Sequence, residues 1–143
     1  MERAIRIEAW SYVEKVLQNT EVAEKGHCAC VDLTTGEIVA GQSAEDLIPL
    51  GTFDQNLTGN GTKKVRVRLF KEVILHRFDN DGSPNALAES DFLKPCYLKD
   101  TKTVSALATN RSVAGRVWAV TSAGVLIEPA ISIGVQGPQG EPG

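Results

Sequence analysis

The sequence predicts a mostly β protein: one small β-barrel or β-sandwich domain, homotrimeric, followed by a collagen-like tail. Three observations support this prediction. Short apolar segments recur at a spacing of about 8–12 residues with turn residues between them, no long segment has helical periodicity, and the last ten residues place glycine at every third position. With 42% hydrophobic and 23% charged residues, the composition is that of a globular protein.

The 143 residues divide into an N-terminal arm (1–25), a β domain (26–129), and a junction that leads into the fibre (130–143). Apolar residues between Ile5 and Leu17 fit both a helix face and a strand. We favour an extended arm, and the helix remains open as the alternative. Whether the β domain is a barrel or a sandwich also stays open at this point.

Apolar and β-branched residues mark the strands of the β domain, and glycine, asparagine and proline mark the turns between them. A hairpin is predicted around Gly36, and Pro49 is expected to place its strand at a sheet edge. Residues 86–91 are expected to form one helical turn or a loop. The predicted strands are 28–33, 38–41, 47–53, 65–78 (one strand, or two with a break near Lys71), 96–98, 104–107, 112–120 and 125–128.

One short segment of this acidic chain is strongly basic. Residues 63–77 carry a net charge of +5, whereas the whole chain carries −3. Three cations there alternate with valine, which predicts a half-buried strand with a basic outer face. No aromatic residues interleave with these charges, so we favour a protein or subunit contact over nucleic acid. The candidate interface residues are Trp10, Tyr12, Lys64, Arg66 and Arg68.

Motifs for catalysis, metal binding or cofactor binding do not stand out in the sequence. We expect Cys28 and Cys30 to share one face of a strand as buried thiols, because the remaining metal-ligand candidates are isolated. The run that begins at Asp79 resembles a calcium loop, but Pro84 and Ser90 occupy the positions that require Gly and Glu. An Asp-Gly hairpin turn is expected there instead. We therefore expect no enzyme, no metal and no cofactor.

The tail gives the most specific signal. Its glycines occupy one strict register, which arises by chance with a probability of order 10⁻⁵ per starting position. In a collagen triple helix every third residue lies at a crowded axis where only glycine fits, and three chains are required. We therefore expect a homotrimer, and further triplets beyond the last glycine. The predicted axis residues are Gly134, Gly137, Gly140 and Gly143.

Four segments carry a resemblance to a known family: 26–39, 88–104, 111–117 and 124–128. Their strand and turn patterns resemble those of the capsid decoration, or cement, proteins of tailed bacteriophages. Such proteins form small β-barrel trimers on the outer face of the head and bind the major capsid protein, and some phage head proteins carry collagen-like fibres. The resemblance covers about two-thirds of the chain and implies a structural protein of the virion.

The expected function is therefore to bind the outer surface of a phage capsid, stabilise the lattice and project a fibre. Expected partners are other copies of the chain, the major capsid protein and, through the fibre, a host-surface ligand, with no nucleic acid and no membrane. Because no secretory signal or apolar span is visible, we expect synthesis in the host cytoplasm and a place on the capsid exterior. The alternative is a receptor-binding or adhesive fibre component that recognises host-surface glycan.

Overall fold

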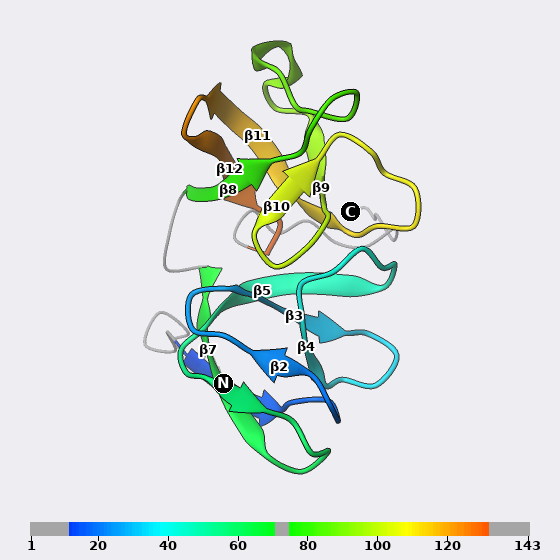
Figure 1. Cartoon of the computed structure of the whole chain (residues 1–143), viewed down its shortest axis with the longest axis vertical. Helices are drawn as coiled ribbons and strands as arrows, with labels where there is room; N and C mark the ends of the chain where they lie inside the picture. Colours follow the sequence, from blue (N-terminus) through cyan, green and yellow to red (C-terminus); the bar gives the residue numbers. More distant parts are fainter. Residues whose placement is uncertain (1–11, 71–74, 132–143) are drawn as a thin grey trace, which may run out of the picture.

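The computed structural model describes residues 12–70 and 75–131 (Figure 1). These residues form β-strands and one 3₁₀ turn, η3 (Glu89–Asp91), with no α-helix among them, so the prediction of a mostly β protein is confirmed. The strands are β1 (Tyr12–Val16), β2 (Val22–Ala23), β3 (Cys28–Asp32), β4 (Ile38–Ala40), β5 (Leu47–Phe53), β6 (Leu57–Thr58), β7 (Lys64–Leu69), β8 (His76–Asn80), β9 (Pro95–Leu98), β10 (Thr103–Ser105), β11 (Val113–Thr121) and β12 (Gly124–Pro129).

Strands β1 to β7 form the first β unit, at the bottom of Figure 1. Its main sheet has the order β1-β7-β5-β3-β4, and β2 pairs separately with β6. The sheet curls, so that a bridge between Leu17 and Ile38 brings its two edge strands together. The backbone N–H of Gln18 donates to the carbonyl of Ile38 at 2.9 Å beside this bridge. One apolar cluster lies wholly inside this unit: Leu17, Ala23, Ala29, Ile38, Phe53, Val65 and Val67.

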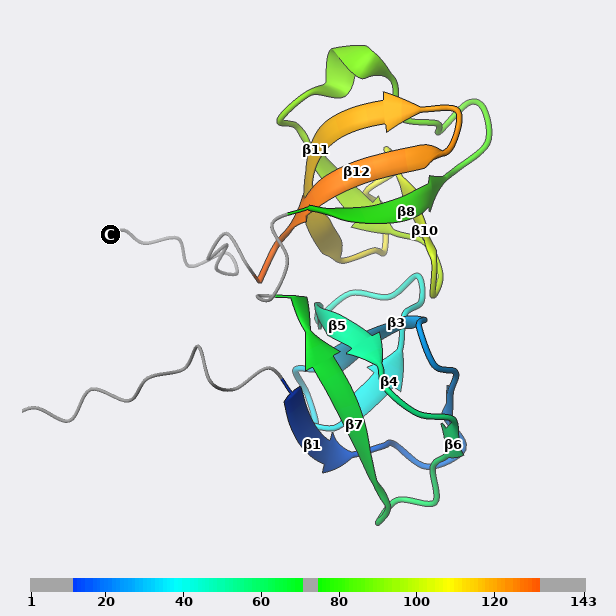
Figure 2. The same cartoon turned by 90° about the vertical axis from the view of Figure 1, so that its left-hand side faces the viewer.

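Strands β8 to β12 form a closed barrel with the order β10-β8-β12-β11-β9. Neighbouring strands pair antiparallel except β10 and β8, which run parallel. This part of the chain therefore resolves the choice between barrel and sandwich in favour of a barrel. Figures 1 and 2 place η3 at the end of the barrel that points away from the first β unit.

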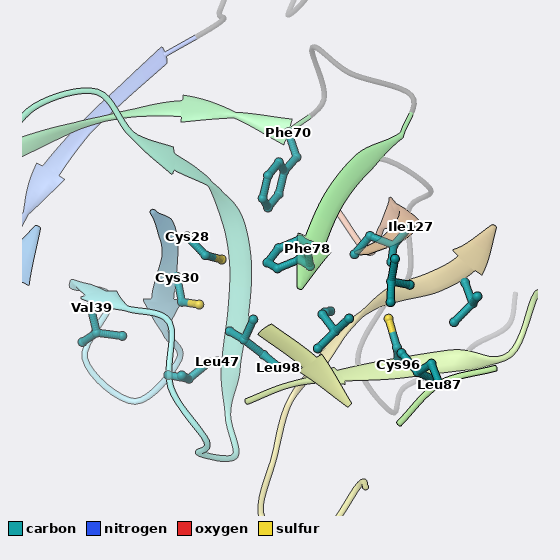
Figure 3. Packing of buried hydrophobic residues seen from close by; sticks show 14 residues of the cluster. Cys28, Cys30, Val39, Leu47, Phe70, Phe78, Leu87, Cys96, Leu98 and Ile127 are labelled. Carbon is teal, nitrogen blue, oxygen red and sulfur yellow. The ribbon is translucent and has the colours of Figure 1, made fainter. Parts of the chain in front are cut away.

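A second apolar cluster joins the two units into one body. It contains Cys28, Cys30 and Leu47 from the first unit together with barrel residues such as Leu98 and Ile127 (Figure 3). Backbone contacts reinforce the join, because the N–H of Cys28 donates to the carbonyl of Thr101 at 2.9 Å. The two β units are therefore packed against each other through a common hydrophobic core.

The cysteines lie where the alternation of the strand predicted. Cys28 and Cys30 both face the shared core, whereas Ala29 between them belongs to the cluster of the first unit. Burial raises the pKa of the Cys96 thiol to about 12. The hydrogen bond with Cys28, together with burial, raises the pKa of Cys30 well above its ordinary value. The thiols of Cys30 and Cys96 are therefore protonated at neutral pH and pack as apolar groups.

Several predicted strands and turns are confirmed by the structure. β3 and β4 form the expected hairpin, and β11 pairs with β12 through the expected turn. The long segment 65–78 is two strands, because β7 belongs to the first unit and β8 to the barrel. The predicted break contains Lys71, which lies outside the described residues. The helical turn expected within 86–91 is present as η3.

The edge position expected from Pro49 is wrong. Its strand, β5, lies between β3 and β7. The proline is accommodated because the register with β3 shifts at this point: Ala29 pairs with Gly51 but Cys30 pairs with Pro49. Pairing with β7 begins only at Gly51. Pro49 therefore lies at a bulge, where a missing N–H is tolerated.

The expected Asp-Gly hairpin turn is also wrong, because β8 pairs with β10 and β12 and not with the strand that follows it. The side chain of Asn80 holds the loop by accepting from the N–H of Leu87 and donating to its carbonyl. The turn itself spans 82–85, where the N–H of Asn85 donates to the carbonyl of Gly82 at 3.0 Å. Side-chain bonds, which a dipeptide rule does not include, determine this loop.

The predicted arm is described only from Tyr12 onward. In that part, β1 pairs antiparallel with β7, and β2 pairs with β6. Leu17 and Ala23 are buried. Residues 12–25 are thus integrated into the first β unit. Trp10 and the tail glycines at 134, 137, 140 and 143 lie outside the described residues.

Candidate functional site

Strand β7 presents the basic outer face that the alternation predicted. The side chains of Lys64, Arg66 and Arg68 are exposed, whereas Val65 and Val67 are fully buried beneath them. We call these three cations the basic face. It lies between β1 on one side and β5 on the other, because β7 pairs with both strands. The inward valines fix the register, and the register places all three cations outward.

The pairing of β1 with β7 brings two of the candidate interface residues into contact. The Arg66 guanidinium lies over the Tyr12 ring, 4.6 Å from the ring centroid. On its other side, the Nε of Arg66 lies 3.3 Å from a carboxylate oxygen of Asp54. Tyr12 remains 40% exposed, so its ring is accessible to a partner as well as to Arg66. An exposed cation–π contact of this kind contributes about 0.5–1 kcal/mol.

Lys64 and Arg68, the other two cations of the basic face, differ from Arg66 in their ion pairing. Among the described residues, no carboxylate forms an ion pair with Lys64 or Arg68. Solvent and salt screen the charges of these exposed side chains, with a Debye length of about 8 Å under physiological conditions. These two cations can therefore meet carboxylates of a partner surface without first breaking an ion pair to a described residue.

The sequence interpretation missed a second exposed feature, on the barrel. The rings of Phe92 and Trp118 meet edge to face with centroids 5.3 Å apart and planes at 65°. Both side chains are exposed, Phe92 by 50% and Trp118 by 45%. We call this pair the aromatic corner. One signal could have found it, because period-2 alternation puts Trp118 on the same outward face as Arg116.

Acid–base and metal chemistry find little support in the described part of the chain. No group of three His, Cys, Asp or Glu side chains gathers there as a metal site would require. The Nδ1 of His27 lies 3.2 Å from a carboxylate oxygen of Glu24, three residues earlier in the chain. His76 is packed between Phe70 and Phe78, and burial lowers its pKa. Within the same residues no helix is long and apolar enough to cross a membrane.

The candidate site therefore consists of two surfaces: the basic face on β7, with Tyr12 beside it, and the aromatic corner on the barrel. Comparison with known proteins gives no relative from which to transfer a role. No protein-family model, no curated protein and no solved structure matches the chain significantly.

Proposed function

We propose that this chain is a non-enzymatic structural protein of a tailed-phage particle, which binds the outer surface of the capsid as a homotrimer and carries a collagen-like fibre. The observation that supports this most is the glycine register at Gly134, Gly137, Gly140 and Gly143, which directly follows a β domain. Glycine at every third position is required where three chains wind around one axis. The resemblance of four segments to capsid decoration proteins favours the same role.

The proposed trimer has a simple geometric requirement, which is that three tails start close to one axis. Figure 2 shows the start of β1 and the end of β12 on the same side of the molecule. Three copies that turn this side toward a common axis would bring their tails together. Three triplets alone are too short to hold a triple helix, so contacts between the β domains, or further triplets, supply the rest of the free energy.

In this proposal the basic face contacts the major capsid protein. Lys64 and Arg68 pair with carboxylates of the capsid surface, and Tyr12 and Arg66 form an aromatic and arginine anchor of the type enriched at binding hot spots. A protein that binds only the assembled lattice stabilises it by RT ln(1 + [L]/Kd), which is about 2.7 kcal/mol at a hundredfold excess over Kd.

The experiment is co-sedimentation of the chain with expanded heads of the encoding phage that were assembled without it. The double variant Lys64→Ser/Arg68→Ser should bind about tenfold more weakly and with a smaller dependence on salt. The double variant Lys25→Ser/Lys102→Ser makes the same charge change at exposed positions away from β7 and should bind like the wild type. Absence of any binding to heads would refute the proposed function. Equal binding by both double variants would refute the role of the basic face.

A further inference from the structure

The aromatic corner is held in place by two irregular pieces of backbone. Trp118 is the extra residue of a bulge, because Val117 pairs with Ile127 while Ala119 pairs with the adjacent Leu126. Leu93, next to Phe92, has a positive φ of 67°, which a leucine seldom adopts. Bulges recur where a side chain must be re-aimed, and a strained non-glycine residue persists only where the surrounding structure fixes it.

Hydrogen bonds lock these two irregularities together. The N–H of Leu93 donates to the carbonyl of Val117 at 2.7 Å, and the N–H of Val117 donates to the carbonyl of Lys94 at 2.9 Å. The segment after η3 is therefore fastened to β11 at the residue before Trp118. The backbone beside both rings is therefore held in place, and the rings contact each other edge to face although both are exposed. A ligand would meet a preorganised pair of rings and would lose little affinity to ordering them.

The exposed apolar area is small for a protein partner. Phe92 and Trp118 expose about half of side chains that bury 150–250 Å² each, so the two rings offer roughly 200 Å². A stable protein interface buries about 800 Å² on each partner. Of the other large exposed hydrophobic residues in the described part of the chain, only Leu93 is adjacent in sequence to one of the rings. The area matches one or two sugar rings better than a protein surface.

The rim of the corner is polar, and its cations are already paired. Lys94 lies 3.7 Å from Asp91, and Arg116 lies 2.8 Å from Glu128. Glu89 of η3 is exposed and has no ion pair in the described part of the chain. The rim thus offers hydrogen-bonding groups without a free positive charge. This charge distribution disfavours acidic ligands, and the carboxylates and paired cations of the rim can hydrogen-bond to the hydroxyl groups of a neutral polar ligand.

We propose that the aromatic corner binds a neutral hexopyranose residue of a glycan. The apolar C–H face of the sugar stacks on one ring, because the face of an aromatic ring is electron-rich and attracts the weakly positive C–H groups. The second ring, tilted by 65°, contacts the edge of the sugar. Hydroxyl groups at the sugar's rim exchange water for the side chains of Glu89, Lys94 and Arg116. This activity is independent of capsid binding and lies on the other β unit.

Saturation-transfer NMR of the full chain with methyl glycosides of glucose, galactose, mannose and N-acetylglucosamine tests the proposal. At least one of these should receive saturation on its C–H face, whereas a methyl sialoside should not. Trp118→Ala and Phe92→Ala should weaken the signal about tenfold, and Trp118→Phe should keep part of it. Leu33→Ala removes an equally exposed hydrophobic side chain of the first unit and should leave the signal unchanged.

Circular dichroism of each variant establishes that it is folded, and Arg68→Ser separates this site from the basic face, because it should bind glycoside like the wild type. The proposal is overturned if none of the four neutral glycosides is saturated by the wild-type chain, or if Trp118→Ala and Phe92→Ala both retain the full signal. It is also overturned if the chain self-associates and Trp118→Ala alone abolishes that association, because the corner is then a protein interface.

Discussion

The two β units expose their functional candidates in opposite ways. The first unit places Lys64, Arg66 and Arg68 on a regular strand, where the buried valines determine which side chains face outward. The barrel places Phe92 and Trp118 on a bulge and beside a left-handed residue, where the backbone departs from regular geometry. A surface built on regular pairing follows from the period of the sequence. Alternation alone indicates that Trp118 faces outward, but its contact with Phe92 depends on irregular backbone and requires the structure.

The units also differ in how they enclose their cores. The barrel closes completely, whereas the first sheet closes only through the bridge between Leu17 and Ile38. The first unit compensates with its own apolar cluster and shares a second cluster with the barrel. We therefore expect the two units to unfold together although they look separate in Figure 1.

The largest expected loss of stability comes from a substitution in the apolar cluster that lies wholly inside the first unit. Phe53→Ala should destabilise the chain by about 3–5 kcal/mol, because the ring is 1% exposed and its removal leaves a cavity. Urea unfolding should shift by the same amount in circular dichroism and in Trp118 fluorescence, recorded in a Trp10→Phe background. A fluorescence midpoint that stays at the wild-type value would show that the barrel unfolds on its own.

The next effect concerns the seam between the units. The carboxylate of Asp81 lies 2.7 Å from Lys99 and 3.9 Å from Arg111, whose Nε donates to the Ser43 hydroxyl of the first unit. Hydrogen bonds from Lys99 and Ser105 lower the pKa of Asp81 to about 2. Asp81→Asn should cost about 2 kcal/mol at pH 7, since hydrogen bonds to charged groups contribute roughly 1.5–3 kcal/mol.

The same carboxylate gives a pH dependence of known sign. Its pKa in the folded state lies below the value of about 3.9 expected in the unfolded chain. Its contribution to stability is therefore complete above about pH 4 and is lost as the pH falls toward about 2. Urea midpoints measured between pH 2 and 7 should show this loss in the wild type but not in Asp81→Asn. The matched variant Asp79→Asn, at an exposed position, should keep it.

Substitution of Gly51 should disturb the basic face alone, and substitution of Gly115 should disturb the aromatic corner alone. A Cβ at Gly51 would overlap the backbone carbonyl of Arg68, and a Cβ at Gly115 would overlap that of Glu128. Each alanine variant should cost about 1–3 kcal/mol, because the paired strand must shift. Gly51→Ala should weaken head binding and spare glycoside binding, and Gly115→Ala should do the reverse. Equal loss of both activities in either variant would indicate general misfolding.

The smallest effects are expected at the exposed rings themselves. Tyr12→Ala and Phe92→Ala should each lower the free energy of unfolding by about 0.5–1 kcal/mol, as exposed cation–π and aromatic pairs do. Equilibrium urea unfolding of the two variants measures this directly. If the free energy of unfolding fell by more than about 2 kcal/mol in one variant, that ring would contribute mainly to the stability of the fold and not to binding a partner.

Much of the fold followed from local pattern, because each strand carries its own alternation and turn residues. The alternation also placed the basic face outward and the two cysteines inward. What remained hidden depended on contacts between distant segments. The pairing of β1 with β7, which puts Tyr12 under Arg66, is not encoded in either segment alone. Two local rules also gave wrong predictions. Pro49 lies at a register shift inside its sheet, and the side chain of Asn80 bonds to Leu87 where an Asp-Gly hairpin turn was expected.

The central claim, a trimer organised around the glycine register, has one direct test. Sedimentation equilibrium of the full 143-residue chain measures its mass in solution over a range of concentrations. We expect a species of three times the 15.4 kDa of the single chain. A chain that remains monomeric at every concentration would contradict it.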